Sequence, residues 1–104
     1  MAKRKRTVQR AADRAQGKLA RDLDKLARLA PGGSAERAIE VVSPAEVEVR
    51  AGSTACPICQ GELRVEEHAA DTIGGVRLRV ASVVCAGCRA RRAIYFRLAG
   101  AMLN

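Results

Sequence analysis

The chain has 104 residues and a formal net charge of +8 at pH 7, and Tyr95 and Phe96 are its only aromatic residues. This length allows one small domain plus an appendage, and a small core with so few large side chains usually needs a metal or disulfides to hold it together. No stretch approaches the ~18 consecutive apolar residues of a membrane span, and no apolar segment follows the basic N-terminus as in a signal peptide, so we expect a cytoplasmic protein with no membrane partner.

The charge is distributed unevenly along the chain. The first 30 residues carry ten Lys and Arg against three Asp, residues 31–71 carry three Arg against eight acidic residues, and residues 72–104 carry six Arg and no acid. An acidic middle segment therefore separates two basic ends.

Residues 7–30 have the spacing of an amphipathic helix. Apolar residues recur every three or four positions, at Val8, Ala12, Ala15, Leu19, Leu23, Leu26 and Ala30. A basic stripe with the same spacing lies roughly opposite, at Arg6, Arg10, Arg14, Lys18, Arg21, Lys25 and Arg28. Pro31-Gly32-Gly33 is a strong helix stop, so we predict a basic N-terminal helix and linker over residues 1–33.

Residues 34–54 have the pattern of short strands that lead into the next unit. Ile39 to Val42 is a short extended run, which Ser43-Pro44 interrupts. Glu46-Val47-Glu48-Val49-Arg50 then alternates polar and apolar residues with a period of two, which is typical of a half-buried strand. We therefore predict a strand at residues 46–50.

Residues 55–104 predict a cysteine turn, a strand, a hairpin, a second strand, a second cysteine turn and a third strand. Alternating residues indicate the strands, which begin at Leu63, Val76 and Ile94. Gly74-Gly75, flanked by Ile73 and Val76, is a two-residue hairpin signal. The hairpin would bring the two cysteine turns together.

Four cysteines are the strongest functional signal. They form the pairs Cys56-Pro57-Ile58-Cys59 and Cys85-Ala86-Gly87-Cys88, separated by 25 residues. Two sulfurs across each tight turn can face one ion, and reduced cytosolic thiols favour a metal over disulfides. Because four thiolates leave no open position, a single structural Zn²⁺ is the leading interpretation. Iron in a rubredoxin-like site and a redox dithiol or zinc-release sensor are the alternatives.

The two cysteine turns differ where the chain leaves them. Pro57 fixes the backbone angle inside the first turn, and Gly61 can take a left-handed conformation at its exit. The second turn has Gly87 inside and no glycine after Cys88. We therefore expect the exit of the second turn to differ from that of the first.

The segment Cys56-Pro57-Ile58-Cys59-Gln60-Gly61, followed by a hairpin and Cys85-Ala86-Gly87-Cys88, resembles the zinc ribbon family over about residues 55–98. The resemblance implies a small three-stranded sheet and four metal ligands, which are Cys56, Cys59, Cys85 and Cys88. With the predicted helix, the expected fold is α+β, an N-terminal amphipathic helix followed by a small antiparallel β zinc-ribbon domain. Zinc ribbons serve in transcription factors, ribosomal proteins, enzyme appendages and protein adaptors, so the resemblance implies no single activity.

No catalytic constellation is present in the sequence. His68 is the only histidine, and it lacks a recognisable partner motif for activating a nucleophile. With four cysteines available, we interpret His68 as a partly solvated strand residue and not as a fifth or substitute metal ligand. We therefore expect a protein that is not an enzyme.

The basic helix and the arginines after Cys88 provide the functional hypothesis. A row of cations on one face can follow a phosphate backbone, and the planar fork of arginine binds two phosphate oxygens at once. Few aromatic residues are available for base stacking, so a duplex or structured RNA is favoured over a single strand. We therefore predict association with DNA or RNA, with contacts from Arg10, Arg14, Lys18, Arg21, Arg89, Arg91 and Arg92.

Three other interpretations of the sequence stay open. The basic stripe can be no more than the solvated face of a helix. The chain can be a protein-interaction adaptor, in which the acidic segment 36–48 or an edge strand at Val47-Glu48-Val49 contacts a protein partner. It can also be a thiol-based zinc or redox sensor. The sequence indicates neither the partner nor the oligomeric state.

Overall fold

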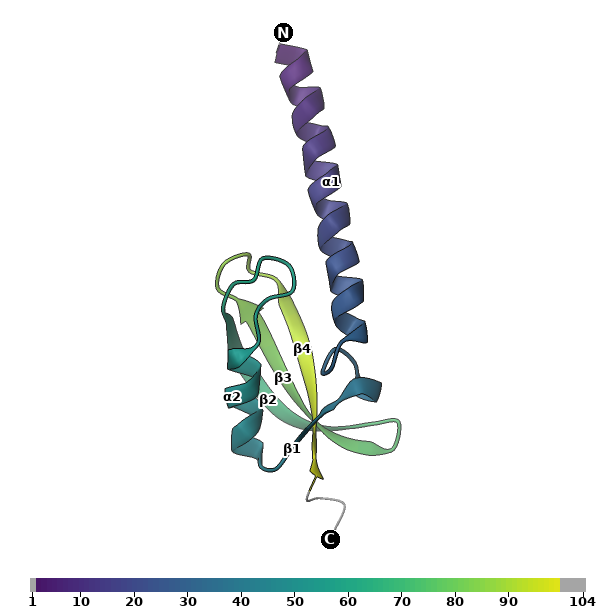
Figure 1. Cartoon of the computed structure of the whole chain (residues 1–104), viewed down its shortest axis with the longest axis vertical. Coiled ribbons are helices and arrows are strands. Elements are labelled where there is room, and N and C mark those ends of the chain that lie inside the picture. The colour runs from purple at the N-terminus through teal and green to yellow at the C-terminus, as the bar shows by residue number, and fades with distance from the viewer. Residues whose placement is uncertain (1, 100–104) are drawn as a thin grey trace.

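A computed structural model describes residues 2–99, with side chains described for residues 8–99. The elements are α1 (Ala2–Leu29), the 3-10 turn η1 (Ala35–Arg37), β1 (Ile39–Val41), α2 (Pro44–Ser53), β2 (Leu63–Ile73), β3 (Val76–Cys85) and β4 (Arg91–Leu98). In Figure 1, α1 projects as a long rod beyond a small body, which the remaining elements form. An N-terminal helix followed by a small sheet confirms the expected α+β class.

The predicted N-terminal helix is confirmed, and α1 begins at Ala2, five residues before the predicted start. Its sequence consists mostly of Ala, Arg, Lys, Leu and Gln, which are strong helix formers. An ion pair one turn apart, Asp24 to Arg28 at 3.1 Å, adds local support. The side chains of the basic run at residues 3–6 lie outside the described ones.

The sheet has four strands in the order β1-β4-β3-β2. The two hairpin-related pairs, β2 with β3 and β3 with β4, are antiparallel, and β1 runs parallel to β4 with Ile39 opposite Phe96. The sheet is therefore mixed, and it has one strand more than the zinc ribbon resemblance implies. The predicted hairpin turn is confirmed, because Gly74 and Gly75 take positive φ angles of 58° and 81°.

The strand predicted at residues 46–50 is wrong, because these residues lie inside α2. Val47 and Ala51, which are one helical turn apart, are both 0% exposed. Val49 points to the other side and is 68% exposed. The alternation of apolar and polar residues therefore arises by coincidence on a helix whose buried face follows a spacing of four.

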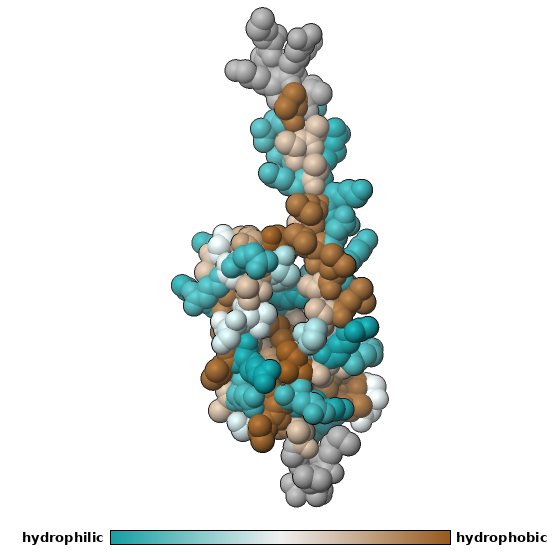
Figure 2. Space-filling model, in the orientation of Figure 1, coloured by the Kyte–Doolittle hydropathy of each residue, from teal (hydrophilic) through white to brown (hydrophobic). Residues whose placement is uncertain are grey.

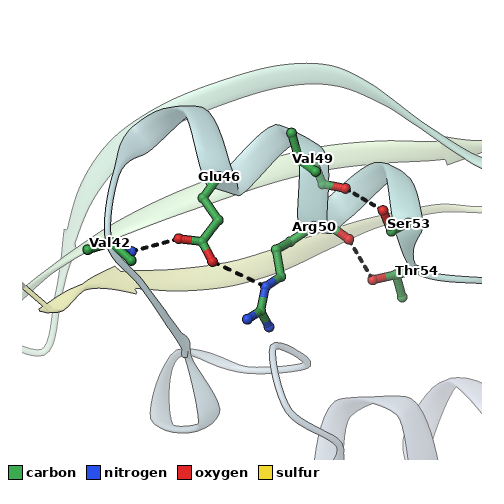
Figure 3. A network of polar contacts seen from close by, with 6 residues as sticks. All are labelled: Val42, Glu46, Val49, Arg50, Ser53 and Thr54. Atoms are coloured by element: carbon green, nitrogen blue, oxygen red, sulfur yellow. Dashed lines mark hydrogen bonds and ion pairs between the residues drawn. The ribbon is translucent and has the colours of Figure 1, made fainter.

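Local contacts at both ends of α2 explain why a helix forms here (Figure 3). Pro44 occupies the first turn, where its missing N–H costs no hydrogen bond. Glu46 accepts a hydrogen bond from the backbone N–H of Val42 at 2.8 Å and lies 3.4 Å from the Nε of Arg50. At the other end, Ser53 and Thr54 donate hydroxyl hydrogen bonds to carbonyls one turn earlier, at 2.7 and 3.0 Å.

The hydrophobic core lies between α2 and the sheet face that it covers. Phe96, in β4, is 0% exposed. Buried residues from every element of the body except η1 complete this cluster, namely Val41, Val47, Ala51, Leu63, Ala81, Val83 and Ile94, together with Cys56 and Cys85. The two buried cysteines place the metal-ligand candidates at one end of the core.

Candidate metal centre

The four cysteines come together at one end of the sheet. Their Sγ atoms all lie within 4.8 Å of one another. The shortest pairs join the two turns, with 3.3 Å between Cys59 and Cys85 and 3.7 Å between Cys56 and Cys88. Sulfurs around a tetrahedral zinc ion are about 3.8 Å apart, as follows from a Zn–S bond of about 2.3 Å. The cluster therefore fits one metal ion, with Zn²⁺ favoured by four thiolate ligands.

The two cysteine turns have the same backbone conformation, contrary to the difference expected at their exits. The residue directly after each second cysteine is left-handed, with φ angles of 64° at Gln60 and 66° at Arg89. In each turn its N–H donates to the carbonyl of the first cysteine, at 2.8 and 3.0 Å. Gly61 does not take a positive φ, so the left-handed residue of the first turn is Gln60, one residue before the predicted position. In both turns the left-handed residue is not a glycine.

Gly61 has a different role, which is to leave space for sulfur. A Cβ at this position would lie 3.0 Å from the Sγ of Cys85 and 3.1 Å from the Sγ of Cys59. At Gly87 the corresponding contacts would be 3.5 and 3.7 Å, which is ordinary van der Waals distance. The first turn therefore passes closer to the ligand sulfurs than the second does.

Backbone N–H groups stabilise negative charge at Cys85. The N–H groups of Cys88 and Gly87 point at its Sγ, at 3.4 and 3.3 Å. The hydrogen bond from Cys88, opposed by burial and assisted by the Cys59 thiol, lowers the pKa of Cys85 to about 6. Thiolates are the form that binds metal, so this local field favours metal binding.

The pKa of Cys88 shifts in the opposite direction. A hydrogen bond from the backbone of Ala90 lowers it, but desolvation and the sulfurs of the other three cysteines outweigh that effect and raise the pKa to about 11. Four close sulfurs cannot all carry a negative charge without a cation among them. A cation at the centre of the cluster would therefore stabilise all four sulfurs as thiolates.

Burial divides the four ligand candidates into two classes. Cys56 and Cys85, the first cysteine of each turn, are buried, whereas Cys59 and Cys88 are exposed. His68 lies in β2, apart from this cluster, and its Nδ1 is 3.6 Å from the Oε1 of Glu48 in α2. The histidine contacts the helix that covers the core and not the sulfur cluster.

The two basic regions predicted from sequence meet beside the first cysteine turn. Arg21, Lys25 and Arg28 of α1 line a groove of about 480 Å³, and Arg91 of β4 lines the same groove. Ile58, between the first two cysteines, contributes its apolar side chain to this groove. The helix stripe is therefore continuous with the arginines that follow Cys88.

Acidic residues neutralise part of this basic surface. Asp24 lies 3.1 Å from Arg28 and 3.8 Å from Arg92, and Glu66 lies 3.6 Å from Arg91. The side chain of Arg92 is only 13% exposed, so it is the least accessible of the predicted phosphate contacts. Five of the predicted phosphate contacts are exposed and form no ion pair within the described part of the chain. These five are Arg10, Arg14, Lys18, Arg21 and Arg89.

Comparisons of the chain with known proteins identify no family. No protein-family model, no curated protein and no solved structure matches it. Within residues 2–99, no helix combines the length and the apolarity that crossing a bilayer requires.

Proposed function

We propose that this chain is a zinc-ribbon-type protein in which one Zn²⁺ ion stabilises the body and a basic surface binds nucleic acid. Four cysteine sulfurs within 4.8 Å of one another support the metal part of the proposal. The ion would be held by Cys56, Cys59, Cys85 and Cys88 in a closed site, so its role is structural and the protein is not an enzyme.

The continuity of the basic surface supports the nucleic-acid part. Exposed cations of α1 follow one side of a helix about 42 Å long, at the usual rise of about 1.5 Å per residue. At its C-terminal end this row reaches Arg91 through the shared groove. A straight row of cations suits the regular phosphates of a duplex or of structured RNA, because such contacts depend on charge and spacing and not on base identity.

The test is the affinity of the full chain for a labelled DNA duplex and for a structured RNA across a series of salt concentrations. The variant R10Q/R14Q/R21Q removes three exposed cations of α1. On B-form DNA, the negative slope of log affinity against log salt becomes shallower by about 0.9 for each phosphate contact that is lost. We therefore expect the variant to have a slope that is shallower by about 2–3.

The matched control removes the same charge elsewhere. Arg37, Arg50 and Arg77 are exposed and lie on η1, α2 and β3, away from the groove. The variant R37Q/R50Q/R77Q should leave the salt slope within about 0.5 of the starting value, because non-contacting charges release no counterions. An equal change of the salt slope in both variants would show that binding depends only on net charge and not on the α1 surface. A chain that does not bind nucleic acid at low salt would refute the proposal.

An adaptor function is the second candidate, and the exposed side of α2 favours it. Val42 and Val49 are 80% and 68% exposed, and they lie beside acidic residues of the segment 36–48. The version that uses an edge strand at residues 47–49 is wrong, because these residues are helical and Val47 is buried. A protein partner that stays bound after nuclease treatment and is released by Val49→Lys would favour the adaptor.

A further inference from the structure

The apolar side of α1 is uncovered. Val8, Leu19 and Leu26 are 69%, 58% and 64% exposed, and the alanines between them are exposed as well. Figure 2 shows hydrophobic surface running along α1 beside hydrophilic surface. Apolar side chains that recur every three or four residues form one continuous stripe, which we define as Val8, Ala12, Ala15, Leu19, Leu23 and Leu26. All of them are exposed except Leu23, which is half-buried.

The body leaves this stripe uncovered except at Leu23. The α1 residues that line the hollows between the helix and the body include Ala20, Asp24, Ala27 and Arg28. At 100° per residue these positions lie about 80–180° around the helix from Leu19, whereas Leu26 lies within about 20° of it. Most of the stability of a helix in a protein comes from packing its amphipathic face, so a projecting helix of this length indicates a further partner.

We infer that the partner is a second copy of this chain, with the two α1 helices packed antiparallel about a two-fold axis at Leu19. The order of side-chain sizes in the stripe carries this inference. With Leu19 on the axis, Ala12 of one copy faces Leu26 of the other, and Ala15 faces Leu23. Leu23 and Leu26 then each meet an alanine, and only Leu19 meets its own copy, on the axis; pairing large with small side chains fills a helix interface without voids.

A parallel pair fits the same stripe less well. It would set Leu against Leu at three levels and Ala against Ala at two levels, which crowds one end and leaves gaps at the other. It would also align the most basic ends of both helices, because residues 3–14 carry six Lys and Arg and one Asp. The antiparallel arrangement separates these ends and opposes the helix dipoles.

Charges at the edge of the stripe also favour self-association. Lys18, at the edge of the basic stripe, and Asp22 lie on the same flank of the apolar stripe, and both are exposed. In the antiparallel pair, Lys18 of one copy lies about 3 Å along the helix axis from the level of Asp22 of the other, within reach of its long side chain, and the symmetry repeats this contact. The basic stripe faces outward in both copies, so it does not oppose the pairing.

The area of contact sets the expected strength. One helix pair of this length lies near the lower limit of stable interfaces, which bury about 1,200 Å² in total. We therefore expect a reversible dimer with a dissociation constant in the micromolar range, measured by sedimentation equilibrium of the full chain. Leu19→Lys should weaken the dimer at least about tenfold, because it places two like charges together on the axis.

The control for this substitution is Val49→Lys, which changes a similarly exposed apolar residue on α2 and should leave the dimer unchanged. Circular dichroism confirms that both variants keep their helix content. A chain that stays monomeric up to about 100 μM, or a dimer that survives Leu19→Lys, overturns the inference. Equal loss of the dimer in Leu19→Lys and Val49→Lys would also overturn the inference.

The substitution Ala12→Leu tests the antiparallel direction. In the antiparallel pair the added side chain collides with Leu26, so the dimer weakens, and the double variant A12L/L26A restores it. In a parallel pair the new leucine meets its own copy and fills a gap, so the dimer strengthens. Strengthening therefore overturns the antiparallel arrangement. The inference rests only on the apolar stripe, so its failure leaves the metal and nucleic-acid proposals unaffected.

Discussion

The body and α1 contrast in how their apolar residues are used. In the body, every large side chain of the core cluster packs between α2 and the sheet, and Phe96 and Val47 are 0% exposed. In α1, side chains of the same type are about two-thirds exposed, as at Val8 and Leu26. Apolar side chains therefore form a core in one region and remain exposed in the other.

This contrast teaches that an amphipathic pattern identifies a face but not what covers it. The body is stabilised by contacts within the chain, and the four cysteine sulfurs cluster at one end of it. Helix α1 has mostly local stabilisation, such as the hydrogen bond from Gln9 to Asp13 at 3.0 Å. The two regions should consequently respond differently to substitutions and to metal removal.

Removal of the metal should have the largest effect. Structural zinc contributes about 10–16 kcal/mol in small modules, so a strong chelator should unfold the body over residues 36–98. Nuclear magnetic resonance spectra should show the signals of β2, β3 and β4 collapsing to unfolded positions, while α1 loses less because its stabilisation is local. An unchanged spectrum after chelation would show that the cysteines do not depend on a metal for the fold.

Core truncation should come next and should separate the two regions most clearly. Phe96→Ala removes a fully buried ring and should lower the free energy of unfolding of the zinc-loaded chain by about 3–5 kcal/mol. Leu26→Ala on α1 should change the free energy of unfolding by less than about 0.5 kcal/mol, when it is measured at a protein concentration at which the chain is monomeric. Comparable losses in urea titrations would mean that α1 belongs to the same cooperative unit as the body.

The smallest effect concerns the two glycines near the sulfurs. Gly61→Ala places a Cβ about 3 Å from two ligand sulfurs, and we expect the zinc affinity to fall about tenfold as the ligands shift. Gly87→Ala meets the sulfurs at 3.5 Å or more and should change the affinity less than about threefold. Competition with a chromophoric chelator measures the zinc affinity of both variants. Equal affinities would contradict the conclusion that the first turn passes closer to the sulfurs than the second.

The sequence predicts the features that depend on short-range pattern. The helix of residues 7–30, the Gly74-Gly75 hairpin and the strands on either side of it follow from periodicity and turn chemistry. The spacing of the four cysteines was sufficient to predict that their sulfurs converge. These features are local, or are brought together by one hairpin.

The features that the sequence did not predict depend on contacts between distant segments or on a competing local signal. The parallel pairing of β1 with β4 joins Ile39 to Phe96 across the whole body, and no alternation pattern encodes it. At α2, Ser43, Pro44 and Glu46 form a helix start signal, which competes with the strand-like alternation of Val47 and Val49. Burial of Val47 against the sheet decides between the two.

The central claim is that four cysteines bind one metal ion and that this ion folds the body. The most direct measurement is a titration of Co²⁺ into the reduced, metal-free chain, followed by its visible absorption and by circular dichroism. We predict one ion per chain, a tetrahedral tetrathiolate spectrum and a gain of β-structure at the same equivalence point, with Cys59→Ser and Cys88→Ser each altering the spectrum. A chain that binds no ion, or that is equally folded before the metal is added, would contradict the claim.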